Sequence, residues 1–127
     1  MKIIISAVMA AVVACLIVAM PANADTDNLQ TLARITMTLN HYPSDAEKAT
    51  LKAIVDSDDS SEEEASIAMA LYNMQHKVKE KDAERLMDIV DDETSNPVAK
   101  DIASILLEVN HSPNDADKAK LAALASN

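Results

Sequence analysis

The sequence predicts an all-α protein made of three 35-residue helix-pair repeats, six short helices in all, in a small α-solenoid-like stack or a compact helical bundle. The first observation is that the segment from Leu32 to Val55 recurs without a gap as Ile67 to Val90 and as Ile102 to Ala125. The second is that apolar residues within each copy are spaced by three and four, as on one face of a helix. A single repeat of this length cannot bury its apolar face alone, and neighbouring repeats bury these faces against one another.

Residues 1–24 have the features of an export signal, and residues 25–127 are expected to form one all-α domain. Lys2 supplies a positive start, residues 3–20 are apolar apart from one serine, and a small-x-small cleavage site ends at Ala24. This pattern predicts a cleaved signal peptide and a periplasmic protein.

Other routes of export remain open. Cys15 ends a segment that resembles a bacterial lipoprotein box, and the run of 18 residues at 3–20 is at the lower limit for an N-terminal membrane anchor. Secretion beyond the periplasm is a further alternative. Cys15 is the only cysteine, so cleavage after Ala24 would remove every thiol and exclude disulfides and thiolate metal sites.

Helix boundaries follow from capping residues. Ser44 with Glu47 and Ser61 with Glu64 are capping boxes, and Pro97 takes the first helical position after a capping asparagine. Asn114 is expected to cap the last helix. The predicted spans of the others include 27–40, 62–76, 80–90 and 97–110. The apolar positions expected in the core of the second and last helices are Ala46, Ala49, Leu51, Ile54, Val55, Ala116, Ala119, Leu121 and Leu124.

Charge and composition exclude several classes of function. The net charge is −10, or −11 for residues 25–127, which hold 10 basic and 21 acidic residues. Such a surface repels nucleic acid and anionic membranes and suits a basic protein or peptide as partner. The chain has no glycine, so glycine-cradled phosphate sites and the Gly-x-Ser-x-Gly nucleophile motif are excluded. We therefore expect no cofactor and no enzymatic activity, while the oligomeric state stays open.

A histidine followed four residues later by an acid occurs once in every repeat. Imidazole and carboxylate groups are ligands for zinc, copper and nickel, so these corners are candidate metal sites. The candidates are His41, Asp45, His76, Glu80, His111 and Asp115. The alternative is structural: each histidine would end a helix, near its negative dipole end, and each acid would begin the next.

Distance favours the structural interpretation of these corners. Equivalent residues of stacked helix pairs are expected about 8 to 10 Å apart, too far for three histidines to share one ion. The acidic run from Asp56 to Glu64 is not a calcium site of the EF-hand type, because Ser61 stands where that loop needs glycine.

Two functions are compatible with these features. The first is an exported, non-enzymatic repeat protein that binds a protein or peptide in the periplasm. The alternative is a metal-sequestering or pH-responsive periplasmic protein that uses the repeated corners and holds a divalent transition metal weakly.

Overall fold

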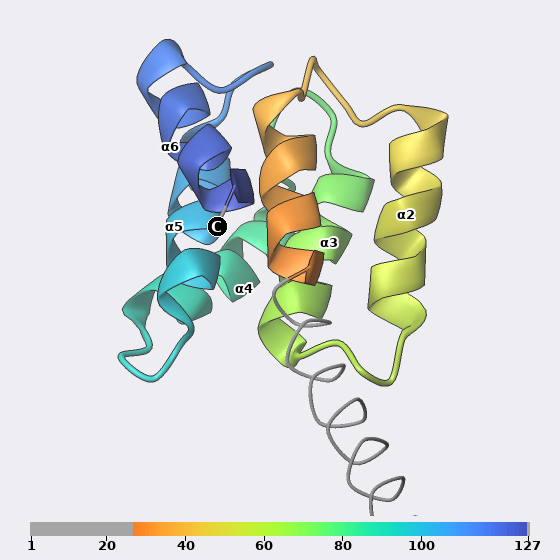
Figure 1. Cartoon of the computed structure of the whole chain (residues 1–127), viewed down its shortest axis with the longest axis vertical. Coiled ribbons are helices and arrows are strands. Elements are labelled where there is room, and N and C mark those ends of the chain that lie inside the picture. The colour runs from red at the N-terminus through yellow and green to blue at the C-terminus, as the bar shows by residue number, and fades with distance from the viewer. Residues whose placement is uncertain (1–26, 127) are drawn as a thin grey trace, which may run out of the picture.

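The computed structural model describes residues 27–126, and within them the backbone forms six helices and no β-strand (Figure 1). The first helix covers residues 27–37 of the described part. It is followed by α2 (Asp45–Asp56), α3 (Glu62–Asn73), α4 (Glu80–Asp91), α5 (Pro97–Glu108) and α6 (Asp115–Ser126). The predicted all-α class is confirmed. The expected signal peptide (1–24), the Cys15 lipoprotein alternative and the anchor at 3–20 lie outside the described residues.

Among residues 27–126, no helix has both the length and the apolar content needed to cross a membrane.

Most helices begin at the predicted capping residues. The Ser44 side chain accepts from the Glu47 N–H while Glu47 accepts from the Ser44 N–H, and Ser61 with Glu64 repeats this arrangement. These reciprocal bonds satisfy backbone donors that the first helical turn leaves without partners. The start of α4 differs, because Lys79 makes no side-chain capping bond.

The first helix, α3 and α5 end earlier than predicted, at residue 37, Asn73 and Glu108. The expected ends were 40, 76 and 110. The residues that follow leave the helical conformation, as the extended backbone of Met74 and Val109 shows. The prediction that each histidine lies in the last turn of a helix is therefore wrong, since all three lie beyond the helix ends.

The core is aliphatic and lies between the helices. In the first helix, α3 and α5 three equivalent pairs of apolar residues have no exposed surface: Leu32 and Ala33, Ile67 and Ala68, and Ile102 and Ala103. Leu51 of α2 and Leu121 of α6 are also fully buried. In α2 and α6 the predicted burial of four alanines is wrong, because these helices cover the core with one narrow face; the exposed residues are Ala46, Ala49, Ala116 and Ala119.

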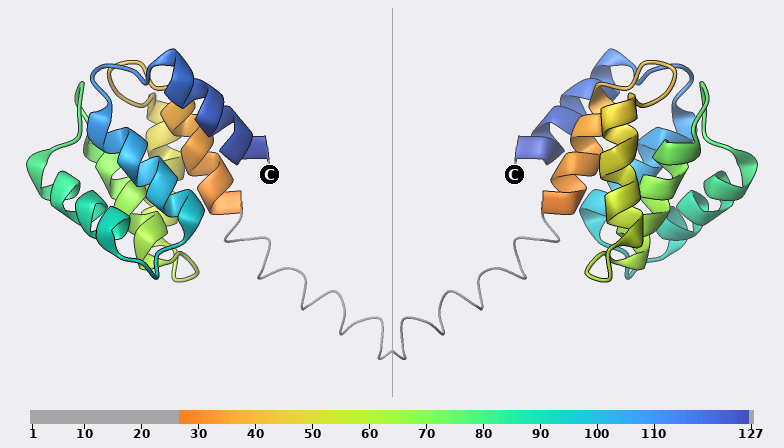
Figure 2. Two further views of the ribbon diagram at one scale, coloured as in Figure 1. Left: turned by 90° about the vertical axis from the view of Figure 1, so that its left-hand side faces the viewer. Right: turned by 90° about the vertical axis from the view of Figure 1, so that its right-hand side faces the viewer.

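The three repeats close into a ring. Helix α2 packs on α3 of the next repeat, and α4 packs more extensively on α5 of the next repeat than on α3. Figures 1 and 2 place α6 beside the first helix, so the last repeat lies next to the first. The compact bundle is therefore the correct alternative of the two that the sequence left open. An open stack with a long concave surface is excluded.

Candidate metal-binding site

The three histidines occupy equivalent turns with the same unusual backbone. His41, His76 and His111 have φ angles of 70°, 68° and 76°, in the left-handed region that favours glycine. In two of the turns the residues before and after the histidine are hydrogen-bonded to each other. Tyr42 N donates to Asn40 O at 2.8 Å, and Lys77 N donates to Gln75 O at 2.7 Å. Such three-residue turns with positive φ are rare and strained.

A cyclic set of backbone hydrogen bonds links these turns. His41 N donates to His111 O at 2.6 Å, His76 N donates to His41 O at 2.7 Å, and His111 N donates to His76 O at 2.6 Å. Each histidine thus donates once and accepts once, and the bonds form a closed triangle between residues 35 positions apart. This triangle explains the positive φ angles, because each turn must point both backbone groups toward the same axis.

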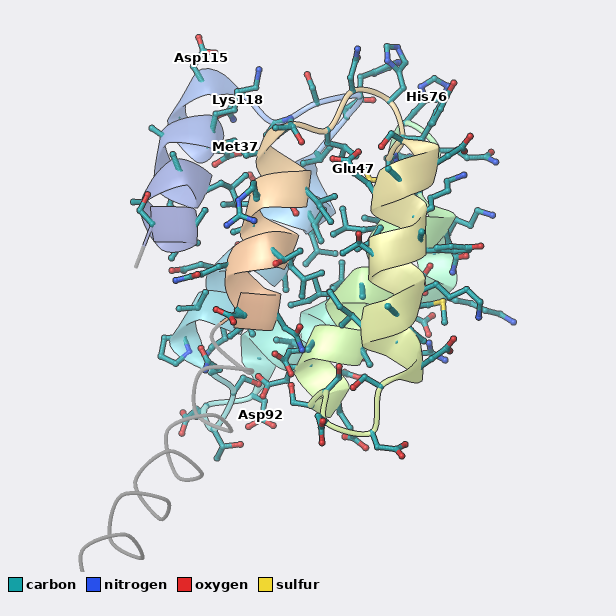
Figure 3. The ribbon with its side chains drawn as sticks, turned by 45° about the vertical axis from the view of Figure 1, so that its right-hand side comes forward. Met37, Glu47, His76, Asp92, Asp115 and Lys118 are labelled. Carbon is teal, nitrogen blue, oxygen red and sulfur yellow. The ribbon has the colours of Figure 1, made fainter. Side chains whose placement is uncertain are left out.

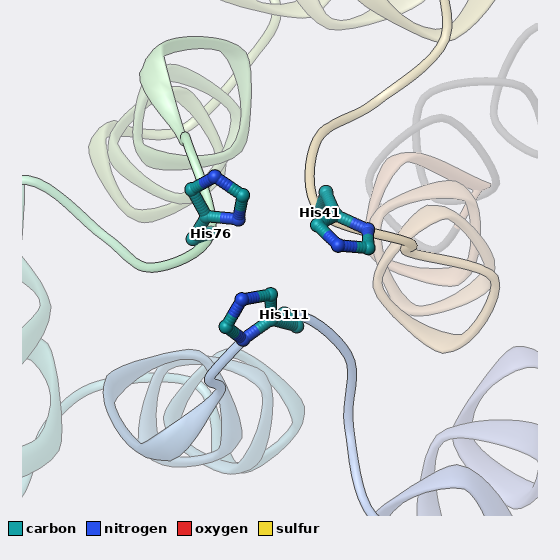
Figure 4. Close-up of side chains that lie close together, drawn as sticks. All are labelled: His41, His76 and His111. Carbon is teal, nitrogen blue, oxygen red and sulfur yellow. The ribbon is translucent and has the colours of Figure 1, made fainter.

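The imidazole rings of the three histidines converge, as Figure 4 shows. Their centroids are 5.1 Å apart for His41 and His76, 4.9 Å for His41 and His111, and 4.7 Å for His76 and His111. One nitrogen from each ring lies within 4.8 Å of the others. The expected separation of 8 to 10 Å is therefore wrong, because these turns meet at the axis of a closed ring, where equivalent residues are closest.

This geometry suits three ligands of one metal ion. Ligands in a tetrahedral zinc site lie roughly 2.0 to 2.1 Å from the ion and about 3.4 Å from one another. The three nitrogens would have to move closer together to reach that spacing, and none of the rings is buried. Three protein ligands leave one coordination position open on the solvent side.

One of the rings already has a partner that would orient it. His41 Nδ1 lies 2.8 Å from Asn40 Oδ1. When Nδ1 carries the proton and donates it to this amide oxygen, Nε2 is left as the metal-binding atom. Gln75 and Asn110 precede the other two histidines, so an amide side chain stands at this position in every repeat.

The acidic partners predicted from the sequence do not join the cluster. Asp45, Glu80 and Asp115 are the first residues of α2, α4 and α6, where a carboxylate interacts favourably with the helix dipole. Within residues 27–126, the histidines are the one group of three or more ligand side chains close enough to share an ion. The structure thus brings together the three histidines and leaves the three acids in the first turns of the helices that follow.

The charge distribution separates the two ends of the bundle. The turns at 40–44, 75–79 and 110–114 contain Lys77 and Lys79 and no carboxylate. The loops at the opposite end, 57–61 and 92–96, contain four acids and no base. Figure 3 shows His76 and Asp92 at these two ends. The three converging side chains therefore offer nitrogen ligands, whereas calcium and magnesium require oxygen ligands.

The sequence interpretation also missed a cavity beside the cluster. Tyr42 and Tyr72, the only tyrosines of the chain, line a cavity of about 440 Å³ together with Lys48, His76 and Lys79. The sequence contains one indication of it, because neither tyrosine recurs at the equivalent positions of the other two repeats.

Comparison of the chain with models of known protein families, with curated proteins and with solved structures finds no match.

Proposed function

We propose that this chain is an exported protein that binds one divalent transition-metal ion through His41, His76 and His111, and that it sequesters the metal without acting as an enzyme. The observation that supports the proposal is the convergence of three accessible imidazoles, with one nitrogen of each within 4.8 Å of the others. Imidazole is a preferred ligand for zinc, copper and nickel.

The backbone triangle supports the proposal because it fixes the ligands before metal arrives. Each histidine is held through its own N–H and C=O, so binding does not have to order a flexible loop. A structural role for these bonds does not require imidazole, because glycine adopts a positive φ more easily than any other residue.

A metal-binding test compares thermal unfolding of the purified protein with and without zinc, copper(II), nickel and calcium. A metal at 100 times its dissociation constant adds about 2.7 kcal/mol of stability. For a domain of this size that corresponds to a rise of roughly 10 °C or more in the unfolding temperature. We expect one of the three transition metals to produce the rise at one ion per chain, and calcium to produce none.

Two sets of variants identify the ligands. His41→Gly, His76→Gly and His111→Gly combined keep a residue that accepts positive φ, and should abolish the metal-dependent rise. Asp45→Asn, Glu80→Gln and Asp115→Asn combined should leave it intact, because these acids begin helices. Binding should also weaken as pH falls, because protons compete with the metal for the imidazole nitrogens. A rise that persists in the histidine variant would refute the proposal.

Capture of a basic protein or peptide is a second candidate function, supported by a cavity at the acidic end. Glu62, Glu63, Asp88 and Asp92 line a volume of about 330 Å³ there, with Arg85 as the one base. The closed ring offers no extended concave surface, so binding would depend on this local charge. A lysine-rich peptide should bind less tightly as salt rises, and affinity independent of salt would refute this candidate.

A further inference from the structure

The two tyrosines line the same cavity beside the histidine cluster. Lys48 Nζ lies 5.9 Å from the centroid of the Tyr42 ring and 6.0 Å from that of the Tyr72 ring, so one ammonium group stands over both rings. The exposed fractions are 59% for Tyr42 and 37% for Tyr72, so neither side chain is needed to fill the core. Large exposed aromatic side chains that gather in one place mark a binding surface more often than scattered ones do.

The repeat provides an internal comparison for this pair. The residues that line the cavity can be compared with those at the equivalent positions of the other repeats. A shift of 35 residues relates Tyr42 to Lys77 and Ser112, and relates Tyr72 to Met37 and Leu107. Lys48 likewise corresponds to Ala83 and Lys118. The equivalent positions of the other repeats adopt the same fold without aromatic residues. The tyrosines are therefore not required for the fold.

The cavity between the tyrosines selects for negative charge. Its charged side chains are Lys48 and Lys79, and no carboxylate lines it, in a chain whose net charge is −10. Its volume of about 440 Å³ is within the range of small-molecule sites. Flat rings that present their faces and edges, together with ammonium groups, suit a ligand with a planar apolar body and an anionic group.

His76 connects this cavity to the metal site, because it lines the cavity and belongs to the histidine cluster. We infer that the metal-loaded protein binds a small aromatic carboxylate, with its ring between Tyr42 and Tyr72 and its carboxylate at the open coordination position of the metal. Lys48 and Lys79 add electrostatic attraction for the same carboxylate. This inference rests on the proposed metal-binding function.

The test uses the protein loaded with cobalt(II), whose visible absorption changes when a ligand of the ion changes. Benzoate and acetate carry the same anionic group, and only benzoate carries a ring. We expect benzoate to alter the cobalt spectrum and to bind about tenfold more tightly than acetate, a ratio within the range of one aromatic contact. Inorganic phosphate should not reproduce the advantage of benzoate, because it has no ring.

Variants that copy the other repeats provide matched controls. Tyr42→Ser and Tyr72→Leu introduce the residues of the third repeat, and together should reduce benzoate affinity to that of acetate without changing cobalt affinity. Lys48→Ala introduces the residue of the second repeat and should weaken both anions. Lys118→Ala removes the equivalent lysine of the third repeat, which does not line this cavity, and should change neither.

The outcomes separate the two proposals. If cobalt does not bind, or binds equally to the triple His→Gly variant, the metal function fails and this inference fails with it. If cobalt binds through the histidines but benzoate has no advantage over acetate or phosphate, the inference alone is wrong. It is also wrong if the tyrosine double variant keeps that advantage.

Discussion

The amide nitrogen of His111 lies 2.6 Å from the carbonyl oxygen of His76, and this bond closes one side of a triangle that no single repeat can make. The triangle requires positive φ at all three corners. Fold and candidate site therefore share the same residues: the backbone of each histidine joins the repeats, and its side chain enters the cluster.

The first prediction concerns the backbone at His111. Glycine adopts φ of 76° without steric cost, whereas in alanine the Cβ atom comes too close to the following carbonyl oxygen at this angle. His111→Gly should be more stable than His111→Ala by about 1 kcal/mol, measured by urea unfolding. The order should reverse at Ser104, an exposed residue of α5, where glycine is about 1 kcal/mol worse than alanine. Equal stability of the two His111 variants would contradict the strain argument.

The second prediction concerns the close approach of the helices at Ala68. This alanine has no exposed surface, and its equivalents Ala33 and Ala103 are buried to the same degree. Ala68→Leu should lower stability by roughly 1 to 3 kcal/mol through overpacking. The same change at the exposed Ala53 of α2 should have little effect. A thermal melt of Ala68→Leu no lower than that of the parent would show that space remains at this position.

The repeat, the helix starts and most of the core could be predicted from the sequence because they depend on local patterns. Ser44 and Ser61 are recognisable caps, and the apolar spacing fixes which face of a helix is buried. The convergence of the histidines could not be predicted in this way. It depends on whether the array closes, and closure is decided by how α6 meets the first helix, a contact between the two ends of the described chain.

Two features of the sequence point to the site once closure is known. His41 and His111 occur in the same pattern, in which an asparagine precedes the histidine and a proline follows two residues later. The chain has no glycine that could adopt the positive φ of these turns. The tyrosines depart from the repeat at positions that flank the histidines. Both features are visible in the sequence, but the sequence alone does not show that these positions lie on one axis.

The third prediction concerns the carboxyl group of Asp92. The Thr94 hydroxyl donates to it at 2.7 Å and the Thr94 N–H at 2.8 Å, and these bonds, helped by Lys100, hold the pKa of Asp92 below its ordinary value. A lowered pKa in the folded state contributes stability above the ordinary pKa of about 3.9, and this contribution is lost as pH falls through the folded value. The effect on stability is small because Asp92 is exposed.

An NMR titration of the Asp92 carboxyl checks this directly. Thr94→Ala removes the hydroxyl, which is the larger cause, and should move the pKa of Asp92 back toward its ordinary value. Thr50→Ala removes a hydroxyl that bonds only to Ala46 O of its own helix, and should leave Asp92 unchanged. A titration curve of Asp92 that is the same in the Thr94→Ala variant and the parent would refute the assignment.

The fourth prediction concerns Lys79, which precedes α4 without a capping bond, whereas Ser44 caps α2 at the equivalent position. Lys79→Ser should raise stability by roughly 1 kcal/mol, because a serine hydroxyl can accept from the first turn of α4. Lys81→Ser removes the same charge within the helix and should give no such gain.

Lys79 also lines the cavity between the tyrosines, so the same substitution should weaken benzoate binding to the cobalt-loaded protein while it stabilises the fold. If Lys79→Ser raises the stability of the protein and lowers its affinity for benzoate, the result would indicate that a lysine occupies this capping position because the anion site needs its charge. Urea unfolding and the cobalt titration measure the two effects separately. If Lys79→Ser stabilises the protein and leaves benzoate affinity unchanged, the missing cap has no connection with the cavity.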